Sequence, residues 1–290
     1  MQFSHTEVYN FEGAFRGMRA PMNSWDKSDS WFGIIDVMTD DGTEMNIVDY
    51  WIDFENIERR ERRREELSYD MEDYNEYYDA LDDYSNWLIR RGVLGPTDEE
   101  SSFYRVAFLG PNDLHLAQKL VLGGTEHSKF MRQIEVSVDI TAPRFWWTEM
   151  DTYKIGTTAN STSTMHKLAS REITPNDFAI MPNDELIVSS GSSPHGGEWE
   201  ITYTDYIDDI VSMCENLRQK YVETKDKQYW RALIEILPQS YLQTRTWTAN
   251  YAVLRNIYFQ RKNHKLEEWN KFCEWIKTLP YAYELITIGE

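Results

Sequence analysis

The chain has 290 residues, of which 41% are hydrophobic and 14% aromatic, so it can bury a large core and overall disorder is not expected. Its formal net charge of -19 argues against a general phosphate-neutralising surface. We therefore expect no DNA or RNA binding, although a locally basic pocket can still hold a small phosphate.

The cysteines and the apolar runs argue against a metal site, a disulfide framework and a membrane segment. Cys214 and Cys273 are too few and too far apart for a zinc site or a disulfide framework, so we expect two buried, reduced thiols and no metal. The N-terminus does not resemble a signal peptide, and no apolar run approaches the ~20 residues that a membrane span needs. The sequence predicts a cytoplasmic protein with no membrane segment.

The first hundred residues divide into two stretches. Residues 15–30 (FRGMRAPMNSWDKSDS) predict a turn region that brings Arg19 and Ser24 close together, followed at 33–50 by a strand, a turn at Asp40–Gly42 and a return. Residues 51–100 have helical composition and alternating charge blocks such as ERRERRREEL. We interpret 51–100 as a charged helical insertion, or partner-contact arm, within a single domain spanning 1–290.

The middle of the chain mixes both periodicities. A short amphipathic helix beginning near Asp113 is predicted to end at Gly123, and alternating apolar residues predict a strand at 132–141. Pro143 is typical of the first turn of a helix carrying RFWWTEMDTYKIG. Residues 156–164 (GTTANSTST) predict a loop that approaches something closely, and 170–198 a long connection that is a lid or a link.

The last third is predicted to be helical, with helices near 203–222, 226–236, 244–264 and 266–277. Within it, Asn250, Leu254, Ile257 and Arg261 step by about one turn and share a helix face. If buried, the Asn and Arg on this apolar face need polar partners, which are either a ligand or a structural hydrogen-bond network.

Basic residues gather locally in this acidic chain. Six of them fall between 245 and 265, namely Arg245, Arg255, Arg261, Lys262, His264 and Lys265. Arginine offers paired donors to phosphate oxygens, so the cluster favours a phosphorylated small molecule.

Several of these segments, taken in order, resemble the flavin-dependent thymidylate synthases. Gly124-Thr125-Glu126-His127 stands for the family's turn before a strand that ends in Ala-Pro, here Ala142-Pro143. The family signature of Arg-His-Arg, seven residues, then Ser is represented by Thr152-Tyr153-Lys154 and Thr162. The family's later Leu-Pro, Asn and Arg correspond to Leu237-Pro238, Asn250 and Arg261.

The resemblance covers roughly 15–30 and 110–280, and it implies both a fold and an activity. The implied fold is α/β (α+β), an antiparallel sheet surrounded by helices, assembled as a homotetramer with shared sites. The implied reaction acts on carbon 5 of a pyrimidine deoxynucleotide monophosphate, dUMP or dCMP, with FAD as cofactor and methylenetetrahydrofolate and NADPH as cosubstrates. The alternative is a catalytically reduced nucleotide-binding or interaction protein that keeps the fold.

The resemblance also implies which residues contact each ligand. Flavin contacts are implied for Arg19, Ser24, His127, Ser128, Lys129, Thr152, Tyr153, Lys154, Asn160, Asn250 and Asn256. Nucleotide contacts are implied for Glu149, Ser161, Thr162, Ser163, Thr164, Arg245 and Arg261. Glu149 replaces a family Gln, and its carboxylate could accept a hydrogen bond from the amino group of cytosine.

Each role has a structural alternative. Arg261 could form an ion pair with Glu267 or Glu268, and Asn250 could be a buried structural amide. Lys154 could mark a solvated helix end, and residues 161–163 could be a plain polar turn.

Overall fold

The alternating apolar residues before Pro143 form strand β5 (Glu135–Pro143), in which Val136, Val138 and Ile140 are fully buried. A computed structural model describes residues 1–36, 92–96, 103–181, 185–193 and 196–290. The strand predicted at 132–141 is confirmed, and it begins later because Lys129–Arg132 turn as the short helix η3.

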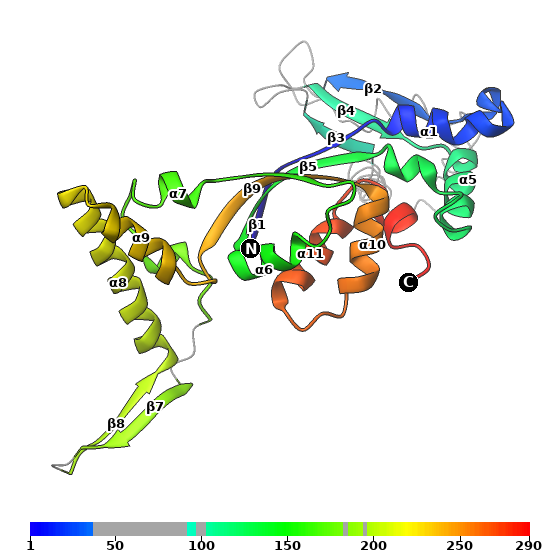
Figure 1. Cartoon of the computed structure of the whole chain (residues 1–290). Helices are drawn as coiled ribbons and strands as arrows, with labels where there is room; N and C mark the ends of the chain where they lie inside the picture. The colour runs from blue at the N-terminus through cyan, green and yellow to red at the C-terminus, as the bar shows by residue number, and fades with distance from the viewer. Residues whose placement is uncertain (37–91, 97–102, 182–184, 194–195) are drawn as a thin grey trace, which may run out of the picture. The chain divides into compact units, whose positions relative to one another are not determined.

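The fold combines helices with antiparallel sheets, as Figure 1 shows. A four-stranded sheet has the order β1-β5-β9-β6, from β1 (Gln2–Tyr9), β5, β9 (Leu242–Asn250) and β6 (Thr158–Ser161). A three-stranded sheet has the order β2-β4-β3, from β2 (Trp31–Asp36), β4 (Phe103–Phe108) and β3 (Val93–Pro96). The hairpin of β7 (Ile187–Ser192) and β8 (Glu198–Thr202) forms a separate antiparallel pair.

The chain divides into two compact units, and the division falls within strands β1, β5 and β9. The first unit comprises 1–4, 139–154 and 158–247, and the second comprises 5–138, 155–157 and 248–290.

The second unit is built around aromatic packing. It contains α1 (Phe11–Arg19), α5 (Pro111–Leu122), α10 (Tyr251–Arg261), α11 (Glu267–Lys277), the short helices η1 (Ala20–Met22), η2 (Trp25–Lys27) and η3, and the π-helical turn η5 (Ala282–Ile286). Phe11 packs edge-on against Tyr251 at 5.6 Å between ring centroids, and the Tyr251 hydroxyl donates to the Pro280 carbonyl at 2.6 Å. Burial of large rings with their polar atoms satisfied stabilises this core.

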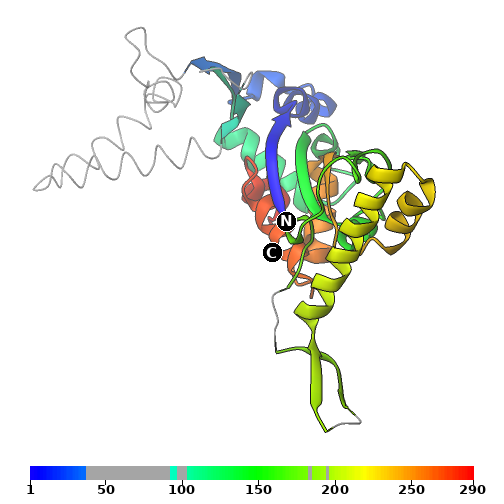
Figure 2. The ribbon, with the colours of Figure 1, turned by 90° about the vertical axis from the view of Figure 1, so that its left-hand side faces the viewer.

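The first unit is dominated by a helix pair. It contains α6 (Arg144–Met150), α7 (Thr164–Lys167), η4 (Pro175–Asp177), α8 (Tyr203–Thr224) and α9 (Lys227–Ile236). Helices α8 and α9 pack around a small apolar cluster that includes Val211, Cys214 and Leu233. Figure 2 shows the β7–β8 hairpin extending from the N-terminal end of α8.

The start of α8 follows from its capping residues. The Thr202 hydroxyl accepts the Asp205 N–H, and the Asp205 carboxylate accepts the Thr202 N–H, which is a capping box. Thr202 is also the last residue of β8, so one residue ends the strand and begins the helix.

The helix predicted at 244–264 is wrong in its first third. Residues 242–250 form β9, with Trp247 and Ala249 buried while Thr244 and Thr246 face outward. β-branched threonines alternating with apolar residues favour a strand, and the helix begins only after Asn250. The helices predicted at 203–222, 226–236 and 266–277 are confirmed as α8, α9 and α11.

Two predicted loops contain regular structure. The stretch 156–164 includes the edge strand β6, and the connection at 170–198 contains η4 and strand β7. The helix that starts after Pro143 ends at Met150 instead of continuing to 156, and Pro143 is its N-cap. In the turn region 15–30, Arg19 is the last residue of α1.

Part of the predicted insertion at 51–100 can be tested. Residues 51–91 and 97–100 lie outside the described residues, as does the turn predicted at 40–42. Residues 93–96 form strand β3 instead of helix, paired with β4.

Candidate functional site

Four of the predicted site residues, Glu149, Thr152, Tyr153 and Lys154, lie at the end of α6 and in the turn that follows it, in the first unit. Trp146 and Trp147 anchor α6 by full burial, and the chain then turns through hydrogen bonds from Thr152 N–H to the Glu149 carbonyl and from Tyr153 N–H to the Met150 carbonyl. The Thr152 hydroxyl also donates to the Glu149 carbonyl, at 2.7 Å. Lys154 is exposed just beyond this turn, as a phosphate contact or a solvated helix end would be.

The hydroxyl-rich segment Ser161–Thr164 begins at the last residue of β6, a strand whose side chains, including Asn160, are all exposed. The Thr162 N–H donates to the Thr244 carbonyl at 2.9 Å, which fixes the segment to β9. The Ser163 hydroxyl accepts the His166 N–H at 3.3 Å and caps the four-residue helix α7. The segment is therefore ordered by its neighbours at both ends, with its hydroxyls at the surface or half-buried.

Arg245 lies at the centre of a contact network in the same unit. Its guanidinium stacks over the Trp147 ring at 4.3 Å from the centroid, and Nη1 forms an ion pair with Asp151 at 2.7 Å. Nε donates to Gln243 Oε1 at 3.2 Å. The side chain is only 16% exposed, so most of the guanidinium surface is already occupied by protein.

Asn250 in the second unit has a clear local role. Its Oδ1 accepts the Val253 N–H at 3.0 Å, so Asn250 is the N-cap of α10. Gly156, with φ of +75°, passes so close that a Cβ there would lie 3.1 Å from Asn250 Nδ2 and Val253 Cγ2. The close approach expected of segment 156–164 is therefore made by Gly156 against the start of α10.

Helix α10 carries the predicted face. Leu254 and Ile257 are fully buried, while Arg261 is half-buried with its guanidinium 4.5 Å from the centroid of the Trp269 ring. Asn256 lies on the exposed side, where its Oδ1 accepts Gln260 Nε2 at 2.9 Å.

Two other basic residues of the 245–265 cluster, Arg255 and Lys262, have individual structural contacts. Arg255 Nη1 donates to the carbonyls of Ile286 and Ile288, at 2.6 and 2.8 Å. Lys262 forms an ion pair with Glu290 at 3.2 Å. Arg255 and Lys262 thus connect the chain's last residues to α10 and its C-cap.

The remaining predicted flavin residues lie in two other segments of the second unit. His127 and Lys129 are exposed, whereas the Ser128 hydroxyl donates to the Gly124 carbonyl at 3.1 Å. Arg19 is buried and ion-paired with the fully buried Asp113 at 2.5 Å, and its Nη1 donates to the Ser24 carbonyl at 3.4 Å.

The sequence patterns do not reveal the partners of these residues. Gln243, Trp147, Asp151 and Asp113 carry the networks around Arg245 and Arg19, yet none of them was a predicted site residue. The alternation in QTRTW could have placed Gln243 beside Arg245 on one strand face.

The two units each hold part of the predicted set. The first holds Glu149, Thr152, Tyr153, Lys154, Asn160, Ser161, Thr162, Ser163, Thr164 and Arg245. The second holds Arg19, Ser24, His127, Ser128, Lys129, Asn250, Asn256 and Arg261.

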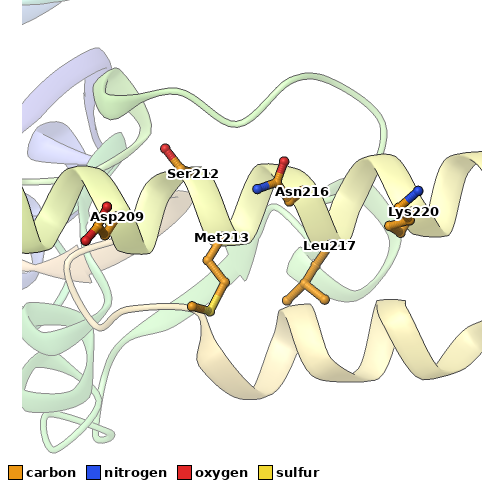
Figure 3. A pocket seen from close by; sticks show the side chains of 6 residues that line it. All are labelled: Asp209, Ser212, Met213, Asn216, Leu217 and Lys220. Atoms are coloured by element: carbon orange, nitrogen blue, oxygen red, sulfur yellow. The ribbon is translucent and has the colours of Figure 1, made fainter.

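A depression of about 460 Å³ lies along α8, as Figure 3 shows. It is lined by Asp209, Ser212, Met213, Asn216, Leu217 and Lys220. It is shallow and open, and no predicted site residue lines it.

The described residues show neither a cluster suited to a metal ion nor a reactive thiol. They contain no group of three His, Cys, Asp or Glu side chains placed to hold a metal ion. Cys214 and Cys273 are free and buried, as expected, and burial raises the pKa of each thiol to about 11. Both thiols stay protonated near neutral pH and are poor nucleophiles. Across the same described stretches, no helix is both long and apolar enough to cross a membrane.

Comparisons with known proteins identify the fold. No family model matches the chain. No curated protein matches it either. The crystal structure of thymidylate synthase X from Helicobacter pylori with FAD and dUMP is similar over 99% of this chain and 97% of that chain, with a TM-score of 0.53 and 14% identity.

Two further structures match over a smaller part. Another structure of the flavin-dependent H. pylori enzyme with FAD and dUMP covers 61% of this chain and 83% of that chain at 19% identity, with a TM-score of 0.43. The UMP/dUMP methylase PolB from Streptomyces cacaoi, bound with 5-Br UMP, covers the same shares at 16% identity and a TM-score of 0.43. The protein has the fold of thymidylate synthase X, as the sequence resemblance implied.

Proposed function

We propose that this protein binds FAD and a pyrimidine deoxynucleotide monophosphate and alters the base at carbon 5. The observation that carries the proposal is the likeness to H. pylori thymidylate synthase X, which extends over nearly the full length of both chains. Several segments of this sequence also resemble the same family, which supports a related activity.

The residues present fit a flavin adenine dinucleotide in part. Its two phosphates require cations or N–H groups when they leave water, and His127, Lys129 and Lys154 are exposed side chains able to supply them. Arg19 is occupied by Asp113 and the Ser24 carbonyl, so we assign it to holding the Ser24 segment. When bound, the flavin would supply a hydride to the reaction.

We assign the nucleotide to residues with hydroxyl, carboxylate and guanidinium groups. Ser161, Ser163 and Thr164 offer hydroxyls to a phosphate, and Arg261 offers a charge already oriented by stacking on Trp269. The Glu149 carboxylate can accept a hydrogen bond from the exocyclic amino group of cytosine, which would favour dCMP over dUMP.

The remaining parts of the proposal come from the resemblance. We propose methylenetetrahydrofolate as the one-carbon donor, NADPH as the reductant, a homotetrameric assembly and a cytoplasmic location. The single-domain organisation over 1–290 also remains a proposal.

A second candidate is a nucleotide-binding or interaction protein with reduced catalysis. The observation that favours it is Thr152, whose hydroxyl bonds the Glu149 carbonyl at a position where the resembling family has an arginine. The absorption spectrum of purified protein distinguishes the two: a flavin band supports the enzyme, and colourless protein that still binds nucleotide supports the alternative.

Arg261→Ala tests the nucleotide assignment. We expect the Kd for dUMP or dCMP to rise roughly tenfold to a hundredfold, the cost of losing one charged contact of about 1.5–3 kcal/mol. Calorimetric titration of wild type and variant measures it, and the unfolding midpoint should change little.

Arg231→Ala is the matched control. The Arg231 side chain is 73% exposed, and its guanidinium forms an ion pair with Glu235 on the same helix. It should leave nucleotide binding unchanged. If wild type binds neither nucleotide, the proposed function fails. If it binds and Arg261→Ala binds equally well, only the assignment of Arg261 fails.

A further inference from the structure

The two faces of strand β9 make different side-chain contacts. On one face, Thr244 Oγ1 lies 2.7 Å from Thr141 Oγ1, and Thr246 Oγ1 donates to Asp139 at 2.5 Å. On the other face, Gln243 and Arg245 lie two residues apart and contact each other. The second face therefore holds a separate polar network on the same strand.

Arg245 sets the orientation of the Gln243 amide. The amide oxygen accepts Arg245 Nε at 3.2 Å, so the NH₂ group must point the other way, where it donates to the Thr162 carbonyl at 2.9 Å. The Gln243 backbone is also fixed, because its carbonyl accepts Trp147 Nε1 at 2.9 Å. Without the guanidinium, the amide oxygen loses the donor that specifies this orientation.

Thr162 is thereby held at both of its backbone groups. Its N–H donates to the Thr244 carbonyl at 2.9 Å, and its carbonyl accepts the Gln243 amide. Ser163 follows directly and caps α7. The position of the hydroxyl-bearing segment Ser161–Thr164 thus depends on β9.

The guanidinium of Arg245 is itself immobilised. Trp147 covers one of its faces, Asp151 binds Nη1 and Gln243 binds Nε. This arrangement suits a group that holds other protein groups in place.

We propose that Arg245 is a positioning residue, which acts through Gln243 to hold Thr162 and the Ser161–Thr164 segment, and does not itself contact the nucleotide. The inference rests on the proposed function of that segment. It replaces the substrate contact that the family resemblance implies for Arg245.

A double-mutant cycle tests the linkage. Arg245→Met keeps an apolar stem on Trp147 and removes the N–H donors, while Gln243→Glu keeps an acceptor for Arg245 and removes the donor to Thr162. We expect each variant to weaken dUMP binding roughly tenfold and the double variant to weaken it by the same tenfold, because both break one chain of contacts. Effects that multiply to roughly a hundredfold would show that Arg245 contacts the nucleotide directly, and would overturn the inference.

A second measurement needs no nucleotide. Hydrogen exchange of peptides covering 161–167 should be at least about fivefold faster in both variants than in wild type, because the Thr162 carbonyl loses its hydrogen bond from Gln243 and only the backbone links to β9 remain. Thr246→Val, on the opposite face of β9, should leave both exchange and binding unchanged. Unchanged exchange in Arg245→Met overturns the inference, whereas faster exchange in a protein that binds no dUMP overturns only the proposed function.

Discussion

The helix pairs α8–α9 and α10–α11 use their apolar residues very differently. Helix α8 has 22 residues but buries only Val211 and Cys214, whereas α11 has 11 residues and buries Trp269, Phe272, Cys273, Trp275 and Ile276. On α8, Tyr206 and Met213 remain more than half exposed.

The difference shows that helical periodicity identifies a helix without revealing how deeply it is buried. Both pairs have apolar residues at helical spacing, and both were predicted from it. Within α11, Phe272 packs against Trp275 with their ring centroids 5.2 Å apart, and Arg261 of α10 lies over the Trp269 ring of α11. The α8 helix depends more on polar contacts such as the Glu215–Arg218 ion pair.

The largest expected effect is in α11. Phe272→Ala removes a fully buried ring that packs against Trp269 and Trp275, and should lower the free energy of unfolding by about 3–5 kcal/mol. Urea denaturation followed by circular dichroism measures it. A loss below about 1 kcal/mol would mean that α11 is no more a core element than α8.

An intermediate effect is expected from Glu215 on α8. Its carboxylate accepts Arg218 Nε and Nη2 and the Ile173 N–H, at 2.7, 2.6 and 2.8 Å. The Arg218 contact, with the Ile173 N–H, lowers the pKa of Glu215 from 4.5 to about 2. Glu215→Gln should lower the free energy of unfolding by about 2 kcal/mol at neutral pH.

The same carboxylate gives a pH dependence. Because its pKa is depressed in the folded state, its contribution is present above pH 4.5 and is lost as pH falls towards about 2. Wild type should therefore lose stability more steeply than Glu215→Gln across that interval. Parallel curves in acid denaturation would show that the contacts of the Glu215 carboxylate contribute nothing measurable to stability.

The smallest effect is expected from Met213→Gln. Met213 is 54% exposed on α8, and a polar side chain of similar length should change the free energy of unfolding by no more than about 0.5 kcal/mol. Thermal denaturation is sufficient to measure this. A clear loss of stability would indicate that this face of α8 is covered in solution.

Sequence patterns predicted most of the helices and strand β5, because their apolar residues repeat at the period of the element. The helix predicted from residue 244 was wrong at β9, where buried Trp247 and Ala249 are two residues apart and alternate with threonines, which is the period of a strand. The hairpin of β7 and β8 was missed because its strands are largely exposed and carry no buried stripe.

The candidate site was predictable only in part, and from motif alignment instead of periodicity. Single residues such as Asn250 can be aligned by motif, but their contacts depend on distant segments. Arg19 illustrates this limit, since its buried partner Asp113 is 94 positions away and no local pattern connects them.

The shared role of Thr202 has a kinetic consequence. Because this residue ends the β7–β8 hairpin and caps α8, strands β7 and β8 and helix α8 are organised by neighbours close in sequence. Loop closure for such contacts costs little entropy, and hairpins and helices form within about 0.1–10 μs. This stretch should therefore acquire its secondary structure well before the long-range pairing of β5 with β9, whose strands are separated by the whole helix pair.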